Sequence, residues 1–199
     1  MPAADIHELQ LAVLRDRFHT RIATAQALFA PLDEYQANWK PAHDRWSVAE
    51  CFRHLNETGS RYADAIAEAV ETARQGGVLG PGPYAYGWVG RTFVNAVTPG
   101  SRPMKTWGSM KPPRSGPDAS SLDARAEVER FVAARRSLME TCAAADGVDL
   151  GRAKMHSPVL PLLRLPILAF LDATAAHDAR HLEQAAQVTH APDFPDRIG

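Results

Sequence analysis

Two histidines four residues apart, His177 and His181, are the side chains of this sequence best suited to chemistry. Residues i and i+4 lie one helical turn apart, so both imidazoles can reach a single metal ion. They sit in the middle of a stripe with steps of three and four residues: Ile167, Phe170, Thr174, His177, His181, Gln184 and Val188. A buried polar side chain without a partner costs roughly 1–3 kcal/mol. A cluster of polar residues on an inward-facing stripe therefore indicates a functional site.

A third imidazole comes from His54, which lies in an earlier segment with helical spacing. Three neutral imidazoles that leave a fourth coordination position open are typical of a catalytic metal site. The alternative is three partly buried histidines whose nitrogens are satisfied by hydrogen bonds. The spacing alone does not separate the two, because eight histidines in 199 residues give roughly 0.3 such pairs by chance.

Several neighbours are candidates to support these imidazoles or to contact a substrate. A ligating histidine usually donates its second N–H to a carboxylate or a carbonyl, and three carboxylates are placed for this: Glu50, Glu57 and Asp178. Solvated surface carboxylates are the alternative for each. Gln184 lies on the stripe itself, where it could hydrogen-bond a bound water or a substrate. His156 precedes the last helical segment, and either approaches the site from a loop or merely packs or caps.

Cys51 lies three residues before His54, so it is a further possible ligand. We interpret it as a small core residue instead, because free cysteine is among the most buried residue types.

Four segments have the spacing of amphipathic helices, and none alternates with the period of two that a β-strand requires. They span about 5–29, 47–75, 121–145 and 166–189. Ser47 and Glu50 form a capping-box sequence at the start of the second segment, and Pro166 suits the first position of the fourth. We predict an all-α fold, a four-helix bundle that forms one domain over 1–199. The second and fourth helices are then either adjacent or diagonal, and both placements allow contact across the core.

A long crossover, residues 76–119, separates the second and third helices. It is rich in proline and glycine, but a disordered linker would lack its aromatic residues: Tyr84, Tyr86, Trp88, Phe93 and Trp107. We predict a short helix over 84–97 and an ordered strap over 98–118; a disordered insertion is the alternative. The aromatic side chains present more apolar surface than a loop can hide, so we expect this crossover to pack on the bundle or to join a homodimer interface.

Three motifs, in order along essentially the whole chain, resemble those of one known family. The stretch WSVAECFRHLNET at 46–58 resembles the signature that opens the second helix of the DinB-like metalloprotein superfamily, Trp-Ser-x-x-Glu followed by His-Leu. The stretch HDARHLEQ at 177–184 resembles the His-x-x-x-His-x-x-Gln ending of that superfamily. His156-Ser157-Pro158 resembles its short motif before the last helix.

The resemblance implies a four-helix bundle, frequently dimeric, in which three histidines bind zinc or nickel, here His54, His177 and His181. It also implies a connection with thiol chemistry, since characterised relatives include bacillithiol and mycothiol S-transferases and a thiol-dependent isomerase. Many members have no known reaction. The crossover is long for this family, which leaves the substrate class open.

Composition excludes several other classes of protein. The formal net charge of −1 argues against a dedicated nucleic-acid binder. The short basic run Arg102, Lys105, Lys111 and Arg114 could hold an anionic thiol cofactor or a nucleic-acid backbone, and a solvated loop is the alternative. The longest apolar stretch, 159–171, is too short to cross a bilayer, and the first ten residues have neither the basic flank nor the apolar core expected of a signal sequence. Two cysteines in separate helical segments do not suggest a disulfide framework, so we expect a cytoplasmic protein.

Two hypotheses of function follow. In the first, the protein is a thiol S-transferase or a hydrolase that acts on a small molecule, with a divalent metal that lowers the pKa of a thiol or a water molecule. A low-molecular-weight thiol is then a second cofactor. In the second, the protein is a metal- or ligand-binding stress-response module without catalytic turnover. An open metal position beside a deep pocket would favour the enzyme, whereas a metal capped by His156 or Cys51 would favour the binding module.

Overall fold

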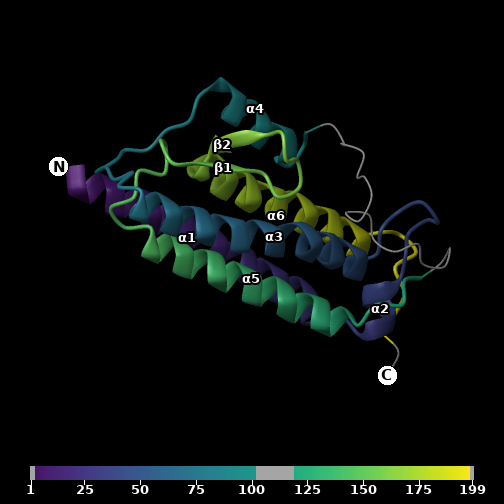
Figure 1. Cartoon of the computed structure of the whole chain (residues 1–199). Helices are drawn as coiled ribbons and strands as arrows, with labels where there is room; N and C mark the ends of the chain where they lie inside the picture. Colours follow the sequence, from purple (N-terminus) through teal and green to yellow (C-terminus); the bar gives the residue numbers. More distant parts are fainter. Residues whose placement is uncertain (1–2, 102–118, 198–199) are drawn as a thin grey trace.

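A computed structural model describes residues 3–101 and 119–197 of the chain. Within these ranges it contains six α-helices and one short pair of antiparallel strands (Figure 1). In order, the elements are α1 Ala3–Phe29, α2 Glu34–Asn38, α3 Val48–Gln75, α4 Trp88–Val97, α5 Ala124–Ala144, β1 Lys154–His156, β2 Arg164–Pro166 and α6 Ile167–Thr189. The fold is therefore mostly helical, as the sequence predicts.

The four long helices α1, α3, α5 and α6 lie along one another. Both α1 and α3 pack against α5 and α6, so α3 is a direct neighbour of α6, and α5 lies diagonally across from α6. This settles the relation between the second and fourth long helices, which the sequence leaves open. The helices that carry the candidate histidines are adjacent.

The start of α3 is fixed by the capping box that the sequence predicts. Ser47 Oγ accepts a hydrogen bond from the Glu50 backbone N–H at 3.1 Å, and Glu50 Oε2 accepts from the Ser47 N–H at 2.9 Å. These two bonds satisfy backbone donors that a helix end otherwise leaves free. Asp123 caps α5 with a single bond of this kind, by accepting from the N–H of Ala126 at 2.9 Å. Each cap marks the residue at which a long helix begins.

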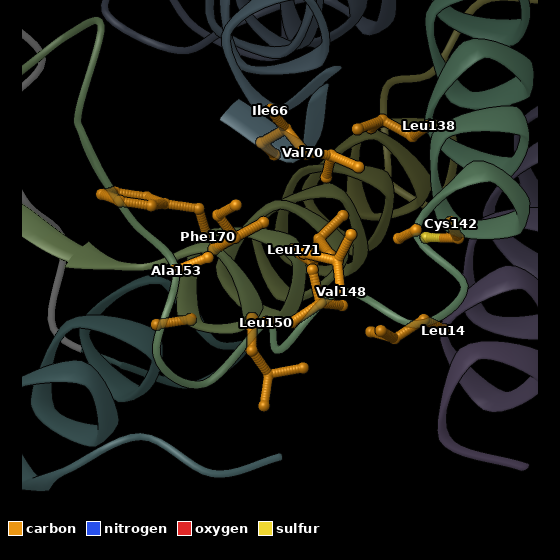
Figure 2. Close-up of a cluster of buried hydrophobic side chains, with 14 of the residues drawn as sticks. Leu14, Ile66, Val70, Leu138, Cys142, Val148, Leu150, Ala153, Phe170 and Leu171 are labelled. Atoms are coloured by element: carbon orange, nitrogen blue, oxygen red, sulfur yellow. The ribbon is translucent and has the colours of Figure 1, made fainter. Parts of the chain in front are cut away.

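The core consists of two large apolar clusters, one toward each end of the long helices, and a small third cluster of Ala37, Ala49 and Ala124. The first gathers around Leu171 of α6, and Figure 2 shows Leu14 of α1 and Cys142 of α5 pointing toward it. The second includes Phe52 of α3 and Leu182 of α6. Between the two clusters the inward-facing side chains are polar, and we call this group the polar layer: His54, Arg135, His177, Asp178 and His181.

Three short elements differ from the predicted order. The sequence predicts no strand, yet Met155 and Leu165 pair across β1 and β2 and are both buried. Each strand has only three residues, and an alternation of apolar and polar residues cannot be recognised over so short a segment. The five-residue helix α2 is also unpredicted, and is started by a second capping box between Asp33 and Gln36.

The crossover is partly as predicted. The short helix begins at Trp88 rather than at 84, because Gly82, Pro83 and Gly87 keep the preceding residues extended. Helix α4 lies along α6 on the side away from α5, next to the strands (Figure 1). Phe93 of α4 meets Phe170 of α6 edge to face, with ring centroids 5.7 Å apart. Most of the predicted strap, and the basic run with it, lies in 102–118, outside the described residues.

Among the described residues, none of the helices has both the length and the apolar character that a membrane span requires. Cys51 and Cys142 are both free and buried.

Candidate metal centre

Helices α3 and α6 bring His54, His177 and His181 together. One ring nitrogen of each residue lies within 4.8 Å of those of the other two, and the Nε2 atoms of His54 and His177 are 3.2 Å apart. Nitrogens that share a tetrahedral zinc ion at about 2.0–2.1 Å would be roughly 3.4 Å apart. His54 and His181 are buried, whereas His177 is partly exposed.

Burial favours the neutral form of the two α6 imidazoles, His177 and His181. Desolvation lowers the pKa of His181 to about 3, and the nearby His54 contributes in the same direction. Desolvation also lowers the pKa of His177 well below 6.5, with further contributions from His181, His54 and Arg135. A metal ion binds only the neutral form of histidine. His177 and His181 are therefore in the protonation state that ligation requires at neutral pH.

Gln184 orients one of the three rings. Its Oε1 lies 2.9 Å from His181 Nδ1. An amide oxygen only accepts, so Nδ1 must carry the proton and Nε2 must carry the free lone pair. Such a bond to the far nitrogen is the usual support of a metal-ligating histidine. The residue sits one helical turn beyond His181, as its place on the predicted stripe requires.

Trp46 packs against two of the imidazoles. Its ring stacks on His181 at 5.7 Å between centroids and 19° between planes, and lies 5.0 Å from the His54 ring. The sequence predicts only a helix start here, because Trp46 directly precedes the N-cap Ser47. The placement limits the rotation of both rings and keeps water from one side of the group.

Asp178 is buried, and its role differs from the predicted one. Instead of binding an imidazole directly, its Oδ2 accepts from Arg135 Nε at 2.9 Å, and its Oδ1 accepts from Arg135 Nη2. Arg135 was not predicted as part of the site. The sequence could have indicated it, because Arg135 lies four residues after Phe131 and three before Leu138. This helical spacing places it on the buried face of α5.

The structure also places the remaining candidates. Glu50 is buried and is engaged in the capping box and with Lys40, whose Nζ is 3.7 Å from Glu50 Oε1. Glu57 is paired with Arg53 at 3.7 Å.

His156 is exposed, and its Nδ1 lies 2.8 Å from the Pro161 carbonyl oxygen, which is a packing role. Neither His156 nor Cys51 belongs to the group of potential ligands found among the described residues.

The donor set fits a divalent transition metal. Three imidazole nitrogens suit zinc, nickel, copper or iron, whereas magnesium and calcium prefer oxygen. The 3.2 Å contact between His54 and His177 is also compatible with a hydrogen bond in metal-free protein, so the alternative of satisfied core histidines has a structural basis too. A surface pocket of about 570 Å³ lies elsewhere, between α1 and α5, and none of the three histidines lines it.

Comparison with known proteins gives one match. Residues 17–185 match a family model described as the DinB superfamily, and this range includes all three histidines, Trp46 and Arg135. No curated protein and no solved structure matches the chain.

Proposed function

The chain belongs to the DinB superfamily, and we propose that it is a metal-dependent enzyme that holds one divalent ion, zinc or nickel, through His54, His177 and His181. The observation that carries the proposal is the convergence of three mostly buried imidazoles, whose nearest ring nitrogens lie within 4.8 Å of one another. The bond from His181 Nδ1 to Gln184 supports it, because this bond leaves Nε2 free to bind an ion.

The reaction we propose is the transfer of a low-molecular-weight thiol, or a hydrolysis, on a small-molecule substrate. A divalent ion supplies Lewis acidity, which lowers the pKa of a thiol or a water molecule. The protein's own thiols are poor nucleophiles, because burial raises the pKa of Cys142 to about 12 and raises that of Cys51 further. His177, as the partly exposed member of the group, lies on the side from which a substrate would approach.

The remaining features of the proposal concern the whole molecule. The four long helices form a four-helix bundle, and residues 1–199 form one domain. The protein works in the cytoplasm, which the two free cysteines favour, and it does not bind nucleic acid. It forms a homodimer through the exposed apolar residues of α4, where Trp88 is 72% exposed.

A second candidate is a metal- or ligand-binding module without turnover. It is favoured by the pocket of about 570 Å³ between α1 and α5, which a ligand could occupy without contact with the histidines.

Elemental analysis of the purified protein, followed by an activity screen, separates the two candidates. The screen offers low-molecular-weight thiols with electrophilic acceptors, and hydrolysable esters and amides, to metal-loaded protein. We expect turnover that stops when a chelator removes the ion, returns when the ion is restored, and is lost in His181→Ala. Stoichiometric metal without any turnover would favour the binding module. Protein that neither contains nor takes up zinc, nickel, iron or manganese near neutral pH would refute the metal-dependent enzyme and the metal-binding form of the module.

A further inference from the structure

We propose that Arg135 is a positioning residue for the metal centre, which it serves without touching the ion. Its guanidinium joins α5 to the two helices that carry the histidines, and so fixes their spacing. This inference rests on the proposed function, since it requires the three histidines to bind a metal.

The bonds of Arg135 end beside the histidines on both helices. On α6, its Nε and Nη2 donate to the two oxygens of Asp178, the residue that follows His177. On α3, the same Nη2 donates at 3.3 Å to the carbonyl oxygen of Leu55, the residue that follows His54. A two-pronged bond of this kind fixes orientation as well as distance. Movement of α3 relative to α6 at the level of the histidines would therefore strain these bonds.

The ring of Phe131, one turn earlier on α5, holds the guanidinium in place. The guanidinium carbon of Arg135 lies 4.0 Å from the centre of this ring, at the distance of a cation–π contact. Helix α5 contributes no histidine to the group of potential ligands. Arg135 therefore supplies no ligand, and its hydrogen bonds act on the site through α3 and α6.

Stability alone does not account for this ion pair. The side chains of Arg135 and Asp178 are both 0% exposed, and Arg135 Nη1 has no hydrogen-bond partner among the described residues. Taking both charges out of water is costly, and well-packed apolar residues in place of such a pair are often as stable or more so. A pair kept in spite of this cost is expected to have a specific role in geometry.

Gly59 of α3 shows that the helix accommodates the guanidinium. A Cβ atom at this position would lie 2.5 Å from Arg135 Nη1 and 2.6 Å from Nη2, which is too close for any real contact. Glycine inside a helix is unfavourable relative to alanine. Helix α3 therefore carries an unfavourable residue at a position where the guanidinium of Arg135 packs against it.

The test measures metal affinity separately from folding. Arg135→Met combined with Asp178→Leu replaces both charges with apolar side chains, and Gly59→Ala displaces the guanidinium while keeping both charges. Arg136→Met is the matched control, since Arg136 is the exposed neighbour on the same helix. For each metal-free protein, circular dichroism reports helicity and melting. Competition with a chromophoric chelator then gives the zinc affinity, and the absorption spectrum of bound Co²⁺ reports coordination geometry.

We expect the double variant and Gly59→Ala to fold, to bind zinc about 10–100-fold more weakly than wild type, and to show an altered Co²⁺ spectrum. The Arg136→Met control should match wild type in all three. Folded variants with wild-type affinity and spectrum would overturn the inference while leaving the proposed metal centre intact. If the double variant loses its helicity, the zinc affinity and Co²⁺ spectrum of Gly59→Ala alone test the inference. A wild-type protein that binds no metal would overturn the proposed function, and this inference with it.

Discussion

His54 of α3 meets both histidines of α6: its Nε2 is 3.2 Å from that of His177, and its ring centroid is 4.5 Å from that of His181. Three imidazoles this close repel one another when protonated, and burial adds to that penalty. The arrangement is therefore favourable only for neutral rings. A metal ion bound by all three rings would stabilise the folded protein.

Removal of one imidazole is the first prediction. His177→Ala and His181→Ala should each abolish stoichiometric metal, because two imidazoles bind an ion far more weakly than three. Helicity should be largely kept, because the apolar clusters on either side of the polar layer do not depend on the ion. Metal content is measured by mass spectrometry and helicity by circular dichroism. His156→Ala, at an exposed histidine, is the control and should retain the metal.

The second prediction concerns thermal stability. An ion that binds the folded state alone stabilises it by about 4 kcal/mol at a thousandfold excess over Kd. For a chain of 199 residues, this corresponds to a rise in Tm of about 8–16 °C. Calorimetry with zinc or nickel, with and without a chelator, measures the rise, and His181→Ala should not respond. A wild-type Tm indifferent to added metal would support the alternative of hydrogen-bonded core histidines.

The local features of the fold follow from the sequence pattern. The long helices appear as stripes of period 3.6, and the capping box at Ser47 is recognisable because its two members are three residues apart. The pair His177 and His181 emerges for the same reason, since one turn of helix brings them together. Such short-range geometry is determined by the helix itself.

The features that depend on packing between helices cannot be predicted from local spacing in the sequence. That α3 is adjacent to α6 depends on the path of the crossover, which no local spacing encodes. The pairing of Arg135 with Asp178 across the core joins residues 43 positions apart. Asp178 is recognisable as a polar residue beside a histidine, but its partner depends on which helix faces it. Strands β1 and β2 are stabilised by their contact with each other and with neighbouring helices rather than by a pattern of their own.

Gln184 provides the third prediction. Gln184→Leu keeps a side chain of similar size but removes the acceptor that orients His181 through Nδ1. We expect metal affinity to fall by about 10–100-fold, while the melting temperature of metal-free protein changes little. Gln187→Leu is the control, because Gln187 is exposed on the same helix. Equal affinities in the two variants would mean that the bond to Gln184 does not support a ligand.

The fourth prediction concerns assembly. Trp88 is 72% exposed and its neighbour Val89 is 43% exposed, at the start of α4. We expect a homodimer in light scattering, and we expect Trp88→Glu to shift it toward monomer, because a charge in an apolar interface is costly. Arg91→Glu, at an exposed position on the same helix, tests whether any added negative charge has this effect. A wild-type protein that is monomeric at all concentrations would contradict the prediction.

The fifth prediction concerns pH and metal-free protein. His181 has a pKa of about 3 in the folded state, against about 6.5 in an unfolded chain. Between these two values the unfolded chain binds a proton that the folded protein does not, so the free energy of unfolding must fall as pH falls. Above about 6.5 neither state is protonated and this contribution vanishes. His177, whose pKa is also lowered, changes stability in the same direction.

The effect of His181 alone amounts to about 2 kcal/mol at pH 5 relative to pH 8, from 1.36 kcal/mol per pH unit below about 6.5. Urea denaturation of chelator-treated protein at pH 8, 6.5 and 5 measures it, and these values stay above the ordinary pKa range of carboxylates. His181→Gln cannot titrate, so its stability should fall by about 2 kcal/mol less than that of wild type between pH 8 and 5. His190→Gln, at an exposed histidine, should behave as wild type. Parallel pH profiles for wild type and His181→Gln would show that His181 is not held neutral in the folded protein, and would remove one support for the metal centre.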